Sequence, residues 1–220
     1  VWGLAILCVL MSIYVGFMNL SYKLQTRKLQ KYPQIINENY KPFVSILIPA
    51  HDEESVIANT VENILNMSYE NFEVIVIDDR SNDNTASVIK DLEQKYEKVS
   101  ALIRSKDAFP GKSAVLNDAF KIAKGEAILV FDADATVEPD FLSILIPHLE
   151  PKDVGAVQAR KIIRNKNTTL LTRCQNNEYT LDTYFQVGRD SVKGAVELRG
   201  NGELIKRQAI EDIGGWNNYT

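Results

Sequence analysis

The sequence predicts an α/β domain with a mainly parallel, mixed sheet covered by helices on both faces and preceded by one transmembrane helix. From residue 43 onward, short apolar runs alternate with segments of helical periodicity, which is typical of parallel sheets. The apolar runs are nearly continuous, as expected of strands buried on both faces. The first 22 residues contain no charged side chain, so they resemble a membrane-spanning helix.

Composition narrows the classes of function. A net charge of −4 and a pI near 5.3 argue against a nucleic-acid binder, which would usually have a basic face. The two cysteines, Cys8 and Cys174, form no metal-type pair and favour a reducing compartment over a disulfide scaffold. Because the chain starts at Val1 rather than Met, and ends on "GGWNNYT", we expect it to be part of a longer protein.

Three segments are expected along the chain. Residues 1–22 form the predicted transmembrane helix, since a bilayer needs about 20 apolar residues. A signal peptide and a buried core helix are the alternatives, but no basic region precedes the apolar run. Residues 23–42 are read as a basic juxtamembrane connector, whose lysines and arginine predict that the following domain is cytoplasmic. Residues 43–220 are the α/β domain, incomplete at its C-terminus.

The predicted strands converge on one polar edge. The strands are expected within 43–49, 72–79, 99–104, 127–134 and 154–160, and the helices within 54–67, 84–96, 112–124 and 140–149. In open parallel sheets, ligands bind beyond the carboxyl ends of the strands. The polar sequences "PAHDEE", "DDRSNDNT" and "DAD" follow the first, second and fourth strands, so we expect a strongly acidic site at that edge.

Asp132 and Asp134 end a buried strand one residue apart. In an extended segment, residues i and i+2 point to the same side, so the two carboxylates could hold one hard divalent cation, with water or phosphate oxygens as further ligands. Such an ion would neutralise a leaving diphosphate. The alternative is that Asp134 caps a turn and Asp132 merely ends the strand; the buried strand favours the metal interpretation.

The first two strand ends favour a nucleotide. A carboxylate of Asp78 or Asp79 could accept a hydrogen bond from a base imide or a ribose hydroxyl. The small residues Pro49 and Ala50 would let a flat base approach the backbone. His51 is read as a surface imidazole, since a single histidine is weak support for a catalyst.

Two further segments carry candidate residues. Lys112 follows Gly111 at a helix start, where it could reach a phosphate; an exposed lysine of a first helical turn is the alternative. Gly200 and Gly202 flank Asn201, so the backbone there can approach a ligand closely. Trp216, after two glycines, could cover a sugar face or pack in the core.

Together, these motifs resemble the inverting family 2 glycosyltransferases. The matching stretches are "SILIPAHDEE", "VIVIDDRSNDNT", "GKSAVLN", "ILVFDAD", "GNGELIKRQAI" and "GGW", and they extend over roughly Val44 to Thr220. Their order and spacing carry the resemblance more than any single motif. The apolar segment before the domain makes membrane-anchored members, such as cellulose, chitin, hyaluronan and poly-N-acetylglucosamine synthases, the most similar.

The resemblance implies a GT-A, Rossmann-like fold. It also implies the transfer of a sugar from a nucleotide-sugar, which we expect to be UDP-linked, to a glycan or lipid acceptor at a membrane. The implied ion is Mg²⁺ or Mn²⁺. The implied nucleotide-binding residues are Pro49, Ala50, Glu53, Asp78, Asp79, Lys112 and Asp132, the metal ligands are Asp132 and Asp134, and the residues facing sugar or acceptor are Asn201, Gly202, Glu203 and Trp216.

The resemblance also sets limits. The family's catalytic base is an Asp in a motif soon after the Gly-Gly-Trp turn, which we expect beyond Thr220, so no base is assigned. The Gln-x-x-Arg-Trp motif of processive members is not in this sequence. A transferase adding a single sugar to a lipid, a non-catalytic nucleotide-sugar-binding subunit, and a phosphohydrolase with Asp132 as nucleophile therefore remain open.

Overall fold

The computed structural model describes residues 2–31, 37, 39–163 and 166–219. The chain divides into two compact units. One comprises Val1–Ile35 and Arg160–Leu198, and the other comprises Ile36–Ala159 and Arg199–Thr220. The second unit contains the sheet and is described first.

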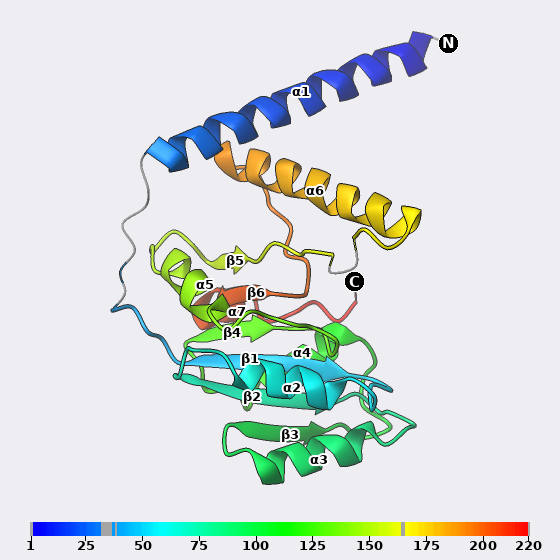
Figure 1. Cartoon of the computed structure of the whole chain (residues 1–220), viewed down its shortest axis with the longest axis vertical. Helices are drawn as coiled ribbons and strands as arrows, with labels where there is room; N and C mark the ends of the chain where they lie inside the picture. Colours follow the sequence, from blue (N-terminus) through cyan, green and yellow to red (C-terminus); the bar gives the residue numbers. More distant parts are fainter. Residues whose placement is uncertain (1, 32–36, 38, 164–165, 220) are drawn as a thin grey trace. The chain divides into compact units, whose positions relative to one another are not determined.

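A six-stranded sheet organises this unit, with the strand order β3-β2-β1-β4-β6-β5 (Figure 1). The strands are β1 (Val44–Ala50), β2 (Phe72–Asp78), β3 (Val99–Ile103), β4 (Ala127–Val130), β5 (Ala156–Gln158) and β6 (Glu203–Lys206). The first four strands pair in parallel, whereas β6 is antiparallel to both β4 and β5. The predicted mainly parallel, mixed sheet is therefore confirmed.

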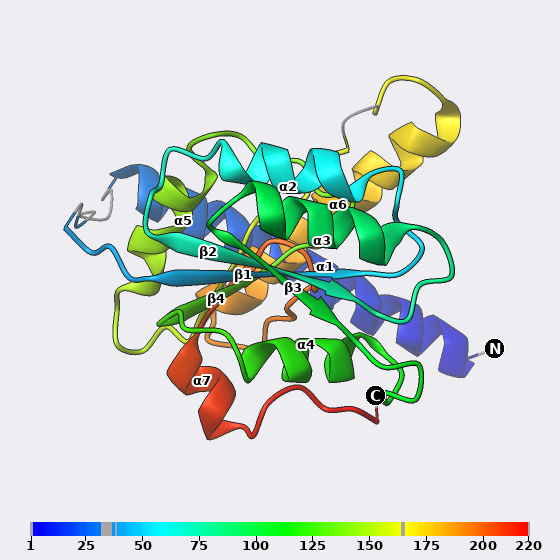
Figure 2. The same cartoon turned by 90° about the horizontal axis from the view of Figure 1, so that it is seen from below.

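Helices cover both faces of the sheet, as Figure 2 shows. The helices of one face are α2 (Ile57–Leu65), α3 (Thr85–Lys95) and α5 (Phe141–Leu149), and those of the other are α4 (Lys112–Phe120) and α7 (Arg207–Asp212). Successive β1 side chains enter opposite cores: Ile46 and Ile48 pack with the first group and Leu47 with the second. Burial on both faces explains why the strands read as continuous apolar runs.

The predicted helices are present but shorter than their sequence patterns. The pattern of 54–67 becomes a helix only at Ile57, because the residues before it form a loop that is hydrogen-bonded to the loop after β2 and to the start of α3. The pattern of 112–124 ends at Phe120, because the chain then turns toward β4. There the backbone N–H groups of Lys124 and Gly125 donate to the buried Ser45 hydroxyl.

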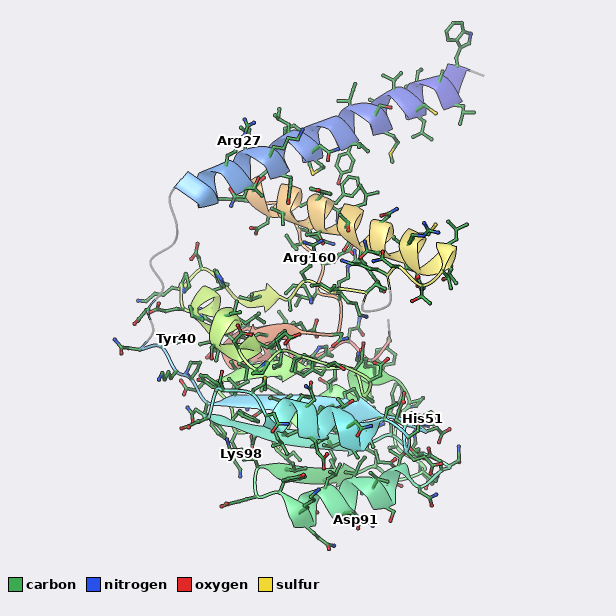
Figure 3. The ribbon with its side chains drawn as sticks, viewed as in Figure 1. Arg27, Tyr40, His51, Asp91, Lys98 and Arg160 are labelled. Carbon is green, nitrogen blue, oxygen red and sulfur yellow. The ribbon has the colours of Figure 1, made fainter. Side chains whose placement is uncertain are left out.

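The strands present their two ends to different surroundings. Figure 3 shows His51 at the carboxyl end of β1 and Tyr40 toward the opposite end. Loops rich in carboxylates follow β1, β2 and β4 at the first of these edges. This edge is the one that the sequence predicted to bind a ligand.

The other unit consists of two helices, α1 (Trp2–Lys31) and α6 (Leu170–Ser191). Tyr14 stacks on Phe185 with ring centroids 6.0 Å apart, and Gly188 lies against Met18. Within the described residues, one helix has the length and hydropathy needed to cross a bilayer, over Trp2–Arg27. The helix continues past residue 22, so the first part of the predicted connector is helical; positions 32–36 and 38 of the connector lie outside the described residues.

Candidate functional site

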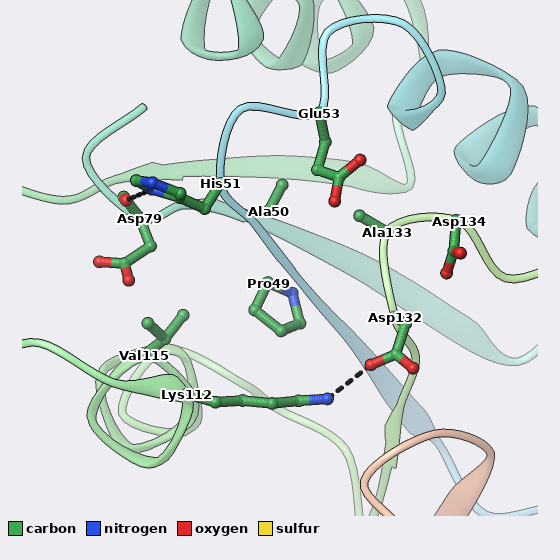
Figure 4. Close-up of a pocket in the computed structure, with 10 residues that line it drawn as sticks. All are labelled: Pro49, Ala50, His51, Glu53, Asp79, Lys112, Val115, Asp132, Ala133 and Asp134. Atoms are coloured by element: carbon green, nitrogen blue, oxygen red, sulfur yellow. Dashed lines mark hydrogen bonds and ion pairs between the residues drawn. The ribbon is translucent and has the colours of Figure 1, made fainter. Parts of the chain in front are cut away.

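A cleft of about 370 Å³ lies at the carboxyl ends of β1 and β4 (Figure 4). Its lining consists of Pro49, Ala50, His51, Glu53, Asp79, Lys112, Val115, Asp132, Ala133 and Asp134. All the residues predicted for nucleotide and metal except Asp78 are in this set. The residues predicted to face sugar or acceptor, Asn201, Gly202, Glu203 and Trp216, lie outside it.

The wall of the cleft beside β1 is held by hydrogen bonds between two loops. The carboxylate of Asp52 accepts from the N–H of Asn82 at 2.6 Å, and the N–H of Glu53 donates to the Thr85 hydroxyl at 2.8 Å. The left-handed backbone of Asp52, with φ of 56°, allows this close approach. Glu53 is consequently directed toward the cleft from a fixed backbone.

Asp79 is held by two guanidinium groups. Its carboxylate lies 2.9 Å from Arg80 Nε and 2.6 Å from Arg104 Nη1. Burial raises the pKa of the Asp79 carboxyl, but the hydrogen bonds from Arg80 and Arg104 outweigh it, so the pKa lies below its usual range. Asp79 therefore stays ionised, and its charge is largely compensated.

Asp78 is placed differently from its neighbour. It is buried, and the alternation along β2 puts its side chain in the layer of Val74 and Val76 rather than in the cleft lining. Its Oδ1 has no hydrogen-bond partner among the described residues. A direct contact of Asp78 with a nucleotide stays a prediction, and the geometry favours Asp79 for that role.

Lys112 and Asp132 form an ion pair across the cleft. The Lys112 ammonium lies 2.6 Å from Asp132 Oδ1, as the dashed line in Figure 4 marks, and 2.8 Å from the carbonyl oxygen of Gly200. Gly111 makes this possible, because its φ of 102° turns the chain so that Lys112 begins α4. The lysine thus faces the end of β4 from the neighbouring helix.

The donor set of the cleft fits a hard divalent cation. Asp132 and Asp134 line the cleft on either side of buried Ala133, and the Asp132 carboxylate already holds one cation, the ammonium of Lys112. Among the described residues, no group of three or more His, Cys, Asp or Glu side chains is arranged to hold a metal. An ion here would therefore need oxygen ligands from water or a diphosphate as well.

The loop before β6 supports this end of the cleft from behind. The Asn201 side-chain oxygen accepts from the N–H of Asp132 at 3.3 Å, and buried Glu203 accepts from the N–H of Gly200 at 3.0 Å. Burial raises the pKa of the Glu203 carboxyl more than the Gly200 N–H and the Lys112 ammonium lower it. A role of Asn201, Gly202 and Glu203 toward sugar or acceptor stays a prediction, because their observed contacts are with the protein.

Trp216 packs inside the sheet unit. Its ring lies edge-on to Phe120 with centroids 5.9 Å apart, and its backbone N–H donates to Asn117 Oδ1 at 2.9 Å. This packing matches the core alternative that the sequence left open. A contact of Trp216 with a sugar is untested.

Sequence reasoning missed Arg104, whose side chain is only 3% exposed. Besides Asp79, its guanidinium reaches Asp118 and the carbonyl oxygen of Phe109. The sequence did contain a signal for this residue, because the arginine directly ends the apolar run "VSALIR". An arginine at the end of a buried strand is itself expected to be buried, and a buried guanidinium needs carboxylate partners. His51, expected at the surface, is exposed but also lines the cleft, and its Nδ1 lies 2.7 Å from the Asp79 carbonyl oxygen.

A comparison with protein-family models decides the family. The model described as "Glycosyl transferase family 2" matches residues 45–214, which include all six strands of the sheet except the first residue of β1. The chain belongs to glycosyl transferase family 2. The family resemblance predicted from the sequence is thereby confirmed.

Two curated relatives of this family 2 chain are named for different products, one a glycolipid and the other a polysaccharide. The chain is 45% identical to a beta-monoglucosyldiacylglycerol synthase of Trichormus variabilis over 181 residues, which are 81% of this chain and 39% of that protein. It is 31% identical to a poly-beta-1,6-N-acetyl-D-glucosamine synthase of Staphylococcus aureus over 215 residues, which are 95% of this chain and 51% of that protein. The chain therefore spans about half or less of the length of these relatives.

Solved structures support the fold of this family 2 chain. A mannosyltransferase of Pyrobaculum calidifontis, solved in complex with GDP-Man and Mn²⁺, superposes with a TM-score of 0.76 over 98% of this chain and 59% of its own. Its sequence is 24% identical to this one, so the likeness concerns the fold. The GT-A-like architecture expected from the sequence is thereby confirmed.

Proposed function

We propose that this chain is the donor-binding part of a metal-dependent inverting glycosyltransferase, which moves a sugar from a nucleotide-sugar to an acceptor hydroxyl. We expect the nucleotide of the donor to be UDP. The observation that carries the proposal is one cleft lined by Asp79 at one end and by Asp132 and Asp134 at the other. The first end suits a nucleoside and the second suits a diphosphate with its ion. Family membership supports the same reading.

The nucleoside half would use the end of β1. Pro49 and the small Ala50 would give a flat base access to the backbone, with Glu53 beside them. Asp79 would accept a hydrogen bond from the base or the ribose, because its carboxylate is kept ionised by Arg104 and Arg80.

The diphosphate half would use the end of β4. Asp132 and Asp134 would hold Mg²⁺ or Mn²⁺, which when bound neutralises charge on the leaving diphosphate. Lys112 would supply a point charge near the same phosphates. A fold neighbour solved with GDP-Man and Mn²⁺ offers a precedent for such an ion in this architecture.

The proposed reaction is a direct displacement. The acceptor oxygen forms a bond to the anomeric carbon from the face opposite the diphosphate, the bond from that carbon to the diphosphate oxygen breaks, and the configuration inverts. The hydroxyl proton goes to a base, which we do not assign to any described residue.

A glycolipid acceptor is favoured over a growing polymer, because identity to the glucosyldiacylglycerol synthase is 45% and identity to the poly-N-acetylglucosamine synthase is 31%. Polymer synthesis is the second candidate, since the match to the latter extends over 95% of the chain. In either case, we propose that α1 anchors the protein in a membrane with the sheet unit on the cytoplasmic side.

The test is calorimetric titration of the protein with UDP-sugars and GDP-sugars, with and without Mn²⁺. We expect binding of one nucleotide-sugar class that depends on Mn²⁺. The double substitution Asp132→Asn with Asp134→Asn should weaken this binding at least about 100-fold, since the loss of a residue that only supports a metal ligand already costs about 10–100-fold. Asp91→Asn, on the exposed face of α3, is the matched control and should bind as wild type does. Undiminished Mn²⁺-dependent binding by the double variant would refute the metal assignment.

A further inference from the structure

The ammonium of Lys112 is paired with the same carboxylate, that of Asp132, that would hold the proposed metal. It lies 2.6 Å from Asp132 Oδ1, with the lysine side chain 42% exposed and the aspartate 35% exposed. A divalent ion on the same carboxylate oxygen would stand a few ångströms from this positive charge. Like charges at that separation repel strongly at the partly buried end of a cleft.

The protein is also built to retain the lysine there. Gly200 is held at both of its backbone groups: its N–H donates to the buried Glu203 carboxylate, and its carbonyl oxygen accepts from Lys112 at 2.8 Å. The φ of Gly200 is +69°, and a Cβ at this residue would lie 3.4 Å from the lysine nitrogen. A glycine at this position therefore serves both the turn and the approach of the ammonium.

We propose that Lys112 is the resident cation of Asp132, and that a divalent ion binds tightly only when a nucleoside diphosphate gives the displaced ammonium a new anionic partner. The inference rests on the proposed function and adds to it a coupling between metal and nucleotide. Without nucleotide, the metal must break the ion pair and leave the lysine near a second cation. With nucleotide, the phosphate oxygens compensate both charges.

The coupling is reciprocal. If the diphosphate raises the affinity for Mn²⁺ by some factor, Mn²⁺ raises the affinity for the diphosphate by the same factor. Lys112 is therefore a positioning residue for the metal and also a direct partner of the phosphate. Its removal should strengthen the binding of the metal alone while it weakens metal-dependent nucleotide binding, a pair of opposite effects that general damage to the fold would not produce.

The experiment measures Mn²⁺ binding to the full chain by electron paramagnetic resonance of the free ion, first without nucleotide and then with UDP. The variants are Lys112→Met, which removes the ammonium, and Lys112→Arg, which keeps the charge. Lys121→Met is the control for net charge, because Lys121 is 73% exposed and pairs with Asp118 outside the cleft lining. Circular dichroism verifies that each variant is folded.

We expect Lys112→Met to bind Mn²⁺ about tenfold more tightly than wild type in the absence of UDP, a factor that equals ~1.4 kcal/mol. The enhancement of Mn²⁺ affinity by UDP should shrink in the same variant. Lys112→Arg and Lys121→Met should bind Mn²⁺ alone as wild type does.

Mn²⁺ bound by folded Lys112→Met no more tightly than by wild type would overturn the inference. The arm without nucleotide tests the ion pair by itself. Failure of wild type to bind UDP with Mn²⁺ would instead overturn the proposed function, and with it the coupling between metal and nucleotide. Equal tightening by Lys121→Met would also overturn the inference, because the effect would then come from net charge.

Discussion

At the scale of single residues, the cleft depends on side chains that hold other side chains. Arg104 is buried and reaches Asp79, Asp118 and the Phe109 carbonyl oxygen, so one guanidinium connects the end of β2 to α4 and to the loop before α4. Five donors in a planar fork allow one arginine to do this, whereas lysine could not hold the same planar geometry. The orientation of Asp79 is therefore fixed by Arg104, a residue outside the cleft lining.

The low pKa of Asp79 gives a pH prediction. A carboxyl whose pKa is lowered on folding contributes stability that is present above its unfolded pKa of about 3.9 and is lost as pH falls through the folded pKa. Asp79→Asn should thus cost about 2 kcal/mol of unfolding free energy at pH 7, the range for hydrogen bonds to charged groups. The gap between variant and wild type should begin to narrow below about pH 4 and should close as pH falls through the folded pKa.

Urea unfolding at several pH values measures this gap. Asp91→Asn, on the exposed face of α3, serves as the control and should show only a small cost at pH 7. A cost of Asp79→Asn that is the same at pH 3.5 and pH 7 would contradict the ion-pair account.

At the scale of elements, the sequence predicted the strands and helices that carry their own apolar pattern. The five predicted strands and four predicted helices are all present. Continuous apolar runs and helical periodicity can be recognised in the sequence without knowledge of the tertiary packing. Three elements were missed. β6 has only four residues and is a strand because it pairs antiparallel with β4, and α7 follows it directly. The polar sequence of α6 hides its contact with α1.

Gly188 shows how α6 depends on that contact. A Cβ at Gly188 would lie 2.9 Å from the Met18 carbonyl oxygen, whereas a Cβ at Gly16 would meet nothing within 4 Å. Alanine normally stabilises a helix by about 1 kcal/mol relative to glycine, so Gly16→Ala should protect α1 slightly. Gly188→Ala should instead loosen the pair of helices.

Hydrogen exchange of α6 amides in detergent micelles checks this prediction. We expect at least about tenfold faster exchange in Gly188→Ala, which corresponds to ~1.4 kcal/mol of lost protection. Exchange as slow as in wild type would mean that the two backbones do not approach closely at this residue.

At the scale of the whole molecule, the candidate site was predictable to a limited depth. The positions of Asp79, Asp132 and Asp134 followed from a single rule, that parallel strands present their carboxyl ends at one edge. The pairing of Lys112 with Asp132 did not follow, because residues 20 apart in sequence meet only through the turn at Gly111. The burial of Glu203 and the packing of Trp216 likewise depend on neighbours that sequence patterns do not reveal.

The chain matches only part of its relatives, 39% of the glucosyldiacylglycerol synthase and 51% of the poly-N-acetylglucosamine synthase. We propose that the cleft is the donor half of the reaction.

The most direct test is a crystal structure of the protein with UDP and Mn²⁺, with anomalous scattering recorded at the manganese edge. The account predicts one manganese peak between the carboxylates of Asp132 and Asp134, the diphosphate beside it, and the Lys112 ammonium moved from Asp132 to a phosphate oxygen. Manganese bound elsewhere, or a nucleotide outside the cleft between Ala50 and Asp134, would contradict it.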